Sequence, residues 1–171
     1  MKNGGTELDF EEYAQARVVR LRQRAYLLCR DWHLAQDLTQ ITLSRLYASW
    51  RKVVKADNID AYAAKVMVRV FLDHKRLKSS HEVVSDTMPS ASAVVDGSGG
   101  PELRLTLMEA LGRLGPRARA IVVLRYWEDH SVEDTAGILG VSSGTVRTRS
   151  QRALLKLRAR LGTDLSELSG R

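Results

Sequence analysis

Residues 131–161 contain two helical patterns separated by a tight turn. Ser131, with an acidic residue three positions further on, forms a capping pair in which the hydroxyl accepts a hydrogen bond from a first-turn N–H. Gly140 is expected to end the first helix, because a residue just past the last turn often needs the positive φ that glycine adopts without strain. Ser142 or Ser143 is then expected to cap the second helix. The segment is therefore predicted to fold as helix, turn and helix.

The second of these helices is amphipathic, and its outer side is strongly basic. At about 100° per residue, one side collects apolar and small residues, namely Val146, Ser150, Ala153, Leu154, Leu157 and Leu161. The opposite side and its edges carry guanidinium, amide and hydroxyl groups, which contact base edges in the DNA major groove. These residues are Arg147, Thr148, Arg149, Gln151 and Arg152. A basic helix on its own is often only a solvated surface, but together with the preceding turn it predicts a DNA-binding helix-turn-helix.

The composition excludes several classes of function. The chain of 171 residues has a net charge of +7, which suits an anionic partner. It lacks the run of about 18 apolar residues that a membrane span requires, and its N-terminus has no signal-peptide pattern. We therefore expect a cytoplasmic protein that does not insert into membranes. Its single cysteine, Cys29, is expected to be a buried small hydrophobe that forms no intramolecular disulfide.

Catalytic and metal-binding motifs are also missing from the sequence. We find no phosphate-binding loop, dinucleotide fingerprint, serine-hydrolase elbow or zinc-protease motif. The four histidines are scattered, and none lies at a metal-like spacing from the cysteine. We therefore predict no enzymatic activity, no catalytic residue, no metal, no cofactor and no small-molecule substrate.

The chain divides at an acidic segment, residues 82–100. This segment has three acidic residues, four serines, three glycines and no lysine or arginine, a composition typical of a linker. Residues 8–81 and 101–162 have helical periodicity with few strand signals. We therefore predict an all-α fold of two helical domains, joined by a flexible acidic linker and followed by a tail at residues 163–171. In the second domain, Pro116 is well placed to begin the second of two helices that precede the helix-turn-helix.

A second basic element lies at the end of the first domain. Residues 51–81 contain eight basic residues and three acidic ones. A run of charge is often only a solvated helix face. Two basic elements on two domains nevertheless favour a nucleic-acid partner over that simpler interpretation.

Two stretches of the chain resemble a known family. The sequence AQDLTQITLSRLYASW, residues 35–50, resembles the helix with which bacterial sigma factors bind core RNA polymerase. Residues 114–161 resemble their promoter-binding fourth region. The small size and the lack of a module between the two domains resemble the extracytoplasmic-function (ECF) group. The resemblance covers residues 10–161, and it implies a subunit that binds core RNA polymerase, directs it to promoter DNA and helps to melt that DNA.

The resemblance also implies roles for individual residues. Contacts to the promoter's minus-35 element fall on Arg147, Thr148, Gln151 and Arg152, with Arg149 beside them. Contacts to the polymerase fall on Asp37, Leu38, Gln40 and Ile41. Contacts to the minus-10 element fall on Asp57, Asn58, Ile59, Tyr62, Lys65, Arg69, Lys75 and Arg76. The acidic linker would occupy the polymerase's cationic RNA channel, although it could equally be a passive tether.

Two other classes of protein share part of this pattern. A conventional regulator pairs a similar helix-turn-helix with a sensory domain, and its phospho-receiver version would need alternating strands and an acceptor aspartate. Residues 1–81 show neither feature. An enzyme that acts on nucleic acid would need a carboxylate cluster to hold metals near a basic face, and the sequence has none. The sequence leaves open which promoter is recognised and whether an anti-sigma factor binds the chain.

Overall fold

The computed structural model describes residues 9–80 and 101–161, and these ranges contain helices but no strand. The helices are α1 (Phe10–Cys29), α2 (Trp32–Ala48), α3 (Trp50–Val53), α4 (Ile59–Ser80), α5 (Pro101–Gly112), α6 (Pro116–Val122), the π-helical η1 (Val123–Trp127), α7 (Val132–Leu139) and α8 (Ser143–Leu161). The predicted all-α class is confirmed. The predicted acidic linker and tail lie outside the described residues.

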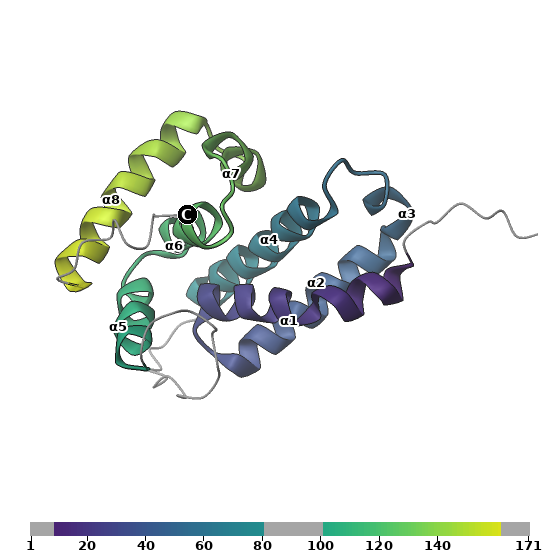
Figure 1. Ribbon diagram of the computed structural model, residues 1–171, viewed down its shortest axis with the longest axis horizontal. Coiled ribbons are helices and arrows are strands. Elements are labelled where there is room, and N and C mark those ends of the chain that lie inside the picture. The colour runs from purple at the N-terminus through teal and green to yellow at the C-terminus, as the bar shows by residue number, and fades with distance from the viewer. Residues whose placement is uncertain (1–8, 81–100, 162–171) are drawn as a thin grey trace, which may run out of the picture.

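Helices α1 to α4 form an N-terminal unit, in which α1, α2 and α4 pack against one another (Figure 1). Their apolar residues recur at helical spacing, so each helix buries one face. The fully buried side chains include Leu28, Leu46, Met67 and Phe71. Helix α1 is a single unbroken helix of 20 residues. Helix α2 ends at Ala48, where Ser49 leaves helical geometry and its hydroxyl donates to the Arg45 carbonyl at 2.9 Å.

Helices α5 to α8 form a C-terminal unit that contains the predicted helix-turn-helix. The Ser131 hydroxyl accepts from the Asp134 N–H at 2.9 Å and so caps α7. Gly140 ends α7 with a φ of 65°. The Ser142 hydroxyl accepts from the Thr145 N–H at 3.1 Å at the start of α8. The predicted helix, turn and helix are confirmed, with Ser142 as the second cap.

The helix that begins at Pro116 departs from its prediction. The spacing of Ala120, Val123, Leu124 and Trp127 predicts a regular helix with these residues on its apolar face, but residues 123–127 form the π-helical turn η1. A π turn takes up an extra residue and rotates the side chains that follow it. Trp127 is therefore 40 % exposed, while Leu124, which lies within the turn, is fully buried.

The two units pack directly on each other. Helix α4 contacts α6 and α7, and α1 contacts α6 and η1 (Figure 1). One hydrophobic cluster includes side chains of both units, among them Leu27, Phe71 and Leu124. Residues 24–29 of α1 are buried in succession. An amphipathic helix with one face toward solvent would bury only one stripe of residues. The C-terminal unit therefore covers the side of α1 that the N-terminal unit leaves open.

Candidate nucleic-acid interface

The outer face of α8 presents the polar groups predicted from its sequence. Arg147, Thr148, Arg149, Gln151 and Arg152 are all exposed. The inner face is buried at Val146, Ser150, Ala153 and Leu157, with Leu154 and Leu161 partly buried. The division predicted from the helical wheel is confirmed. Packing of the inner face fixes the rotation of α8, so the donor-rich face points to solvent without any rearrangement of the helix.

Arg147 lies closer to α7 than its neighbours on this face do. Its Nη2 donates to the Glu133 carboxylate at 3.1 Å, and both side chains are more than half exposed. An exposed ion pair of this kind contributes ~0–1 kcal/mol. The pair is therefore weak enough to be exchanged for a contact to DNA. The pair joins two helices through residues 14 positions apart, so no local sequence pattern predicted it.

The α2 residues expected to contact polymerase divide into two groups. Asp37, Gln40 and Ile41 are exposed, and their spacing of three and four residues puts them on one face of the helix. Ile41 is 44 % exposed, which is high for a large apolar side chain. Leu38 is only 1 % exposed and belongs to the hydrophobic core. The Leu38 side chain therefore points into the fold and holds α2 in place, and its expected contact with polymerase stays a prediction.

The residues expected to contact the minus-10 element extend from the loop before α4 along that helix. Asp57 and Asn58 are exposed, and the Asn58 side-chain oxygen accepts from the Ala61 N–H at 2.9 Å as an N-cap. Ile59 packs against the core. Four side chains share one side of α4 at helical spacing, namely Tyr62, Lys65, Arg69 and Arg76. Lys75 is rotated from Arg76 by about 100° and does not share that side.

Arg119 is a structural residue that the sequence analysis did not identify. It is 6 % exposed, and its guanidinium donates to four carbonyl oxygens, those of Leu28 at 2.6 Å, Leu111 at 2.8 Å, Leu114 at 3.0 Å and Gly112 at 3.1 Å. The last carbonyls of a helix have no partner within it. Arg119 supplies partners at the ends of α1 and α5 together, which ties the two units to each other. Burial lowers the pKa of Arg119 to about 10, so the guanidinium stays charged at neutral pH.

Arg24 and Glu128 form a second tie between the units. They make a buried ion pair in which each side chain is only 3 % exposed, and Arg20 lies 3.6 Å from the same carboxylate. The two partners are separated by 104 positions in the sequence. No local pattern links residues so far apart, so sequence analysis had no signal for this pair.

Within residues 9–80 and 101–161, the side chains form no metal-binding arrangement and no membrane span. No group of three or more His, Cys, Asp or Glu residues in these ranges could hold a metal ion. No helix in them is both long and apolar enough to cross a bilayer. The charged surfaces of α8, α2 and α4 are therefore the features on which a functional assignment rests.

Comparisons with known proteins give matches in both units. The family model described as Sigma-70 region 2 matches residues 9–81, and that described as Sigma-70, region 4 matches residues 104–157. An RNA polymerase sigma-E factor from Streptomyces avermitilis is 40 % identical over 157 residues, which cover 92 % of this chain and 87 % of the relative. The RNA polymerase sigma factor CarQ from Myxococcus xanthus is 32 % identical, with 92 % of each chain covered.

The fold is also similar to that of solved structures. The sigma factor RpoE from Bartonella quintana, in complex with the anti-sigma factor NepR, gives a TM-score of 0.75. The two chains are 24 % identical, and the match covers 91 % of this chain and 98 % of that one. At this level of identity the likeness concerns the fold alone.

Proposed function

Because this chain belongs to the sigma-70 family of transcription initiation factors, we propose that its two helical units divide promoter recognition between them. The matches to regions 2 and 4 and the ECF-type relatives identify a factor that directs RNA polymerase to specific promoters. Its role is to position the polymerase rather than to catalyse a reaction, and it acts in the cytoplasm, where the polymerase acts. The finer assignment of roles to residues is our proposal.

In this proposal, α8 enters the major groove at the minus-35 element. The observation that supports it best is the exposed row of guanidinium, hydroxyl and amide groups on a helix whose other side is fully packed. Arg152 lies near the centre of the exposed face on the helical wheel and reaches a base edge, where an arginine can donate two hydrogen bonds to a guanine. Arg147 divides its contacts between a base and a phosphate once it leaves Glu133.

The minus-35 assignment is tested by Arg152→Ala in binding assays with promoter and scrambled DNA. We expect the affinity for promoter DNA to fall by roughly 1–3 kcal/mol, with relaxed preference at one position of the site. Arg160→Ala is the matched control, because it removes the same charge from an exposed position two turns further along α8. An equal loss on both DNAs for Arg152→Ala would show that Arg152 touches only phosphate.

In the N-terminal unit, α4 and the loop before it contact the minus-10 element. Tyr62 offers an aromatic face for an unstacked base, and Lys65, Arg69 and Arg76 continue along the same side of α4 as contacts for the phosphate backbone. Asn58 contributes with its side-chain amide, because its oxygen is already engaged in capping α4. Tyr62→Ala should therefore reduce the opening of promoter DNA more than the binding of closed promoter fragments.

The exposed face of α2 binds core polymerase through Asp37, Gln40 and Ile41. Reversing the charge at Asp37 should weaken holoenzyme assembly, because charges across an interface are arranged in complementary pairs. The comparison is between Asp37→Arg and Glu12→Arg, which makes the same reversal at an exposed position on α1. Circular dichroism would establish that both variants are folded, and unchanged assembly by Asp37→Arg would remove α2 from the polymerase interface.

Run-off transcription with purified core polymerase tests the function as a whole. The protein should start transcription at a promoter that core enzyme alone ignores. The similar RpoE fold was solved with an anti-sigma factor, and we propose that a protein of that class also binds this chain. Such a protein should lower run-off transcription when it is added before core polymerase.

A further inference from the structure

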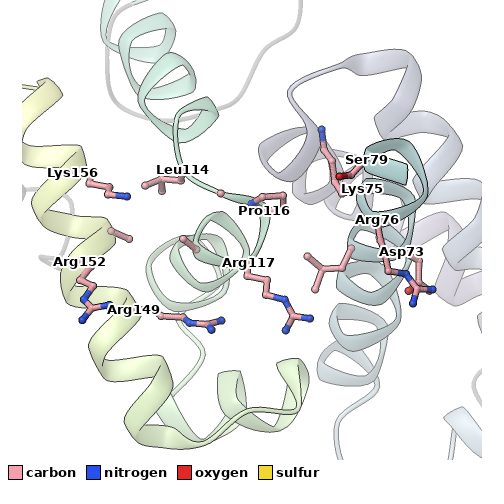
Figure 2. Close-up of a pocket in the computed structure, with 14 residues that line it drawn as sticks. Asp73, Lys75, Arg76, Ser79, Leu114, Pro116, Arg117, Arg149, Arg152 and Lys156 are labelled. Carbon is pink, nitrogen blue, oxygen red and sulfur yellow. The ribbon is translucent and has the colours of Figure 1, made fainter. Parts of the chain in front are cut away.

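A basic cleft lies where the two units meet. It has a volume of about 690 Å³ and is bounded by α4, the turn between α5 and α6, and α8 (Figure 2). This volume is within the range of about 300–1,000 Å³ that is usual for small-ligand sites. The lining contains one acidic side chain, Asp73, and six basic ones, Lys75, Arg76, Arg117, Arg149, Arg152 and Lys156.

The cations of the cleft come from both units, which pack directly on each other. Lys75 and Arg76 belong to α4, whereas the others belong to α6 and α8, with Arg117 and Arg149 extending toward the space between α8 and α4 (Figure 2). The units are tied by the hydrogen bond of Arg119 to the Leu28 carbonyl and by the buried Arg24–Glu128 pair. Like charges that line one cleft repel one another. An anion between them would relieve that repulsion.

We propose that this cleft binds a compact polyphosphate anion and that the bound anion competes with promoter DNA. The anion contacts Arg117 and Lys156 together with Arg149 and Arg152, two residues that the proposed function assigns to DNA. Competition therefore rests on that assignment, but anion binding does not.

The chemistry of the lining favours phosphate over a peptide. Arginine and lysine side chains are donors without acceptors, and a phosphate chain offers only acceptors. Arginine also matches the oxygens of a phosphate with two parallel hydrogen bonds. An acidic peptide would bring backbone N–H donors into the cleft, and the side-chain acceptors there are Asp73 and Ser79. Unpaired N–H groups would weaken its binding.

The lining also disfavours single-stranded nucleic acid. Proteins that bind single strands combine a basic groove with aromatic side chains on which the bases stack. None of the side chains that line this cleft is aromatic; the apolar ones are Leu72, Leu114, Pro116, Ala118 and Ala153. The cleft therefore has the charge for phosphate groups but no platform for bases.

The test is calorimetric titration of the full chain with inorganic tripolyphosphate at two salt concentrations. The decisive variant is Arg117→Gln, because Arg117 is an exposed cleft residue that has no proposed role in promoter recognition. We expect it to raise the dissociation constant roughly tenfold, as the loss of a charge-assisted hydrogen bond would. Arg51→Gln, an exposed charge on α3 outside the cleft, is the matched control and should leave the constant unchanged.

Several results would overturn the proposal. Absence of binding would do so, and so would equal weakening by both variants, which would mean that tripolyphosphate follows net charge alone. If hexaglutamate or a short single-stranded oligonucleotide binds more tightly than tripolyphosphate, and Arg117→Gln loses this binding, the ligand of the cleft belongs to that class and not to the polyphosphates.

A second arm measures whether tripolyphosphate displaces a promoter fragment from the wild type more readily than from Arg117→Gln. If anion binding depends on Arg117 but DNA is displaced from both proteins alike, competition at the cleft is refuted. If the wild type does not bind promoter DNA at all, with or without core polymerase, the proposed function fails, while the calorimetric result stands by itself.

Discussion

Removing the charge of Glu128 should destabilise the contact between the two units strongly. Arg24 and Glu128 are each 3 % exposed, and the Nε and Nη1 atoms of Arg24 have no hydrogen-bond partner. Glu128→Gln would leave the Arg24 guanidinium as a buried cation without a counter-charge. Breaking such a buried pair from one side costs about 3–5 kcal/mol.

The reverse single change should cost less. In Arg24→Met, the Glu128 carboxylate still has Arg20 at 3.6 Å, and the Arg20 side chain is 54 % exposed and free to move closer. We therefore expect a loss toward the lower end of the same range of about 3–5 kcal/mol. The double variant Arg24→Met with Glu128→Leu buries two apolar side chains and no charge. Replacing a buried pair in this way is often close to neutral, roughly 0–1 kcal/mol.

Urea unfolding of the four proteins, followed by circular dichroism and by tryptophan fluorescence, gives the free energies of unfolding. Trp127 is next to Glu128 in the sequence, so part of the fluorescence comes from beside this contact, and Trp32 and Trp50 in the N-terminal unit supply the rest. The expected order of stability is wild type and double variant first, then Arg24→Met, then Glu128→Gln. If the double variant, which has no charge left at either position, loses as much stability as Glu128→Gln, the loss does not come from an unpaired buried charge. The reasoning from the buried pair would then be wrong.

Three further predictions concern local structure. No heavy atom lies within 4 Å of a Cβ added at Gly137 or Gly140, so the backbone conformation alone decides the effect of an alanine there. Gly137→Ala within α7 should stabilise the protein by about 0.5–1 kcal/mol. Gly140→Ala, at a φ of 65°, should destabilise it by about 1–2 kcal/mol. Urea midpoints that move in the same direction would contradict this. Ser131→Ala should cost about 1 kcal/mol through loss of the cap on α7, and an unchanged midpoint would refute the role of that cap. Burial raises the pKa of the Cys29 thiol from its ordinary 9.0 to about 11, so a disulfide reagent at pH 8 should react slowly with native protein and rapidly in urea. Rapid labelling of the native protein would refute the burial of Cys29. Because the thiol of the unfolded state loses its proton at lower pH than that of the folded state, Cys29 should also make stability fall as pH rises from about 9 to 11.

The helix-turn-helix was predictable because its determinants are local. A serine hydroxyl caps an N–H three residues away, glycine takes a positive φ, and apolar side chains repeat with the period of the helix. Each of these features depends on a few neighbouring residues, and the structure contains all three. For the same reason, the wheel of α8 predicted which of its residues are exposed.

Prediction was less successful where a residue's surroundings come from another helix. A helical wheel of α2 does not show which of Leu38 and Ile41 is buried, because the helix that covers α2 is not known from the sequence. The family resemblance therefore assigned both residues to a partner. The structure separates them, with Leu38 at 1 % and Ile41 at 44 % exposure. The π turn at residues 123–127 was also missed, because an α-helix and a π-helix require similar residues and differ in packing.

By itself, the sequence determined the all-α class, the helix-turn-helix with its caps and the basic outer face of α8, since all of these follow from hydrogen bonds and periodicity within a few turns. Only the tertiary structure decided that the two units pack together. That packing depends on Arg24 and Glu128, 104 positions apart, and on Arg119, whose partners are backbone carbonyls. Every residue carries a carbonyl, so such acceptors leave no mark in a sequence. The fold alone brings four of them to 2.6–3.1 Å from a guanidinium nitrogen, and it alone gathers six cations around one cleft.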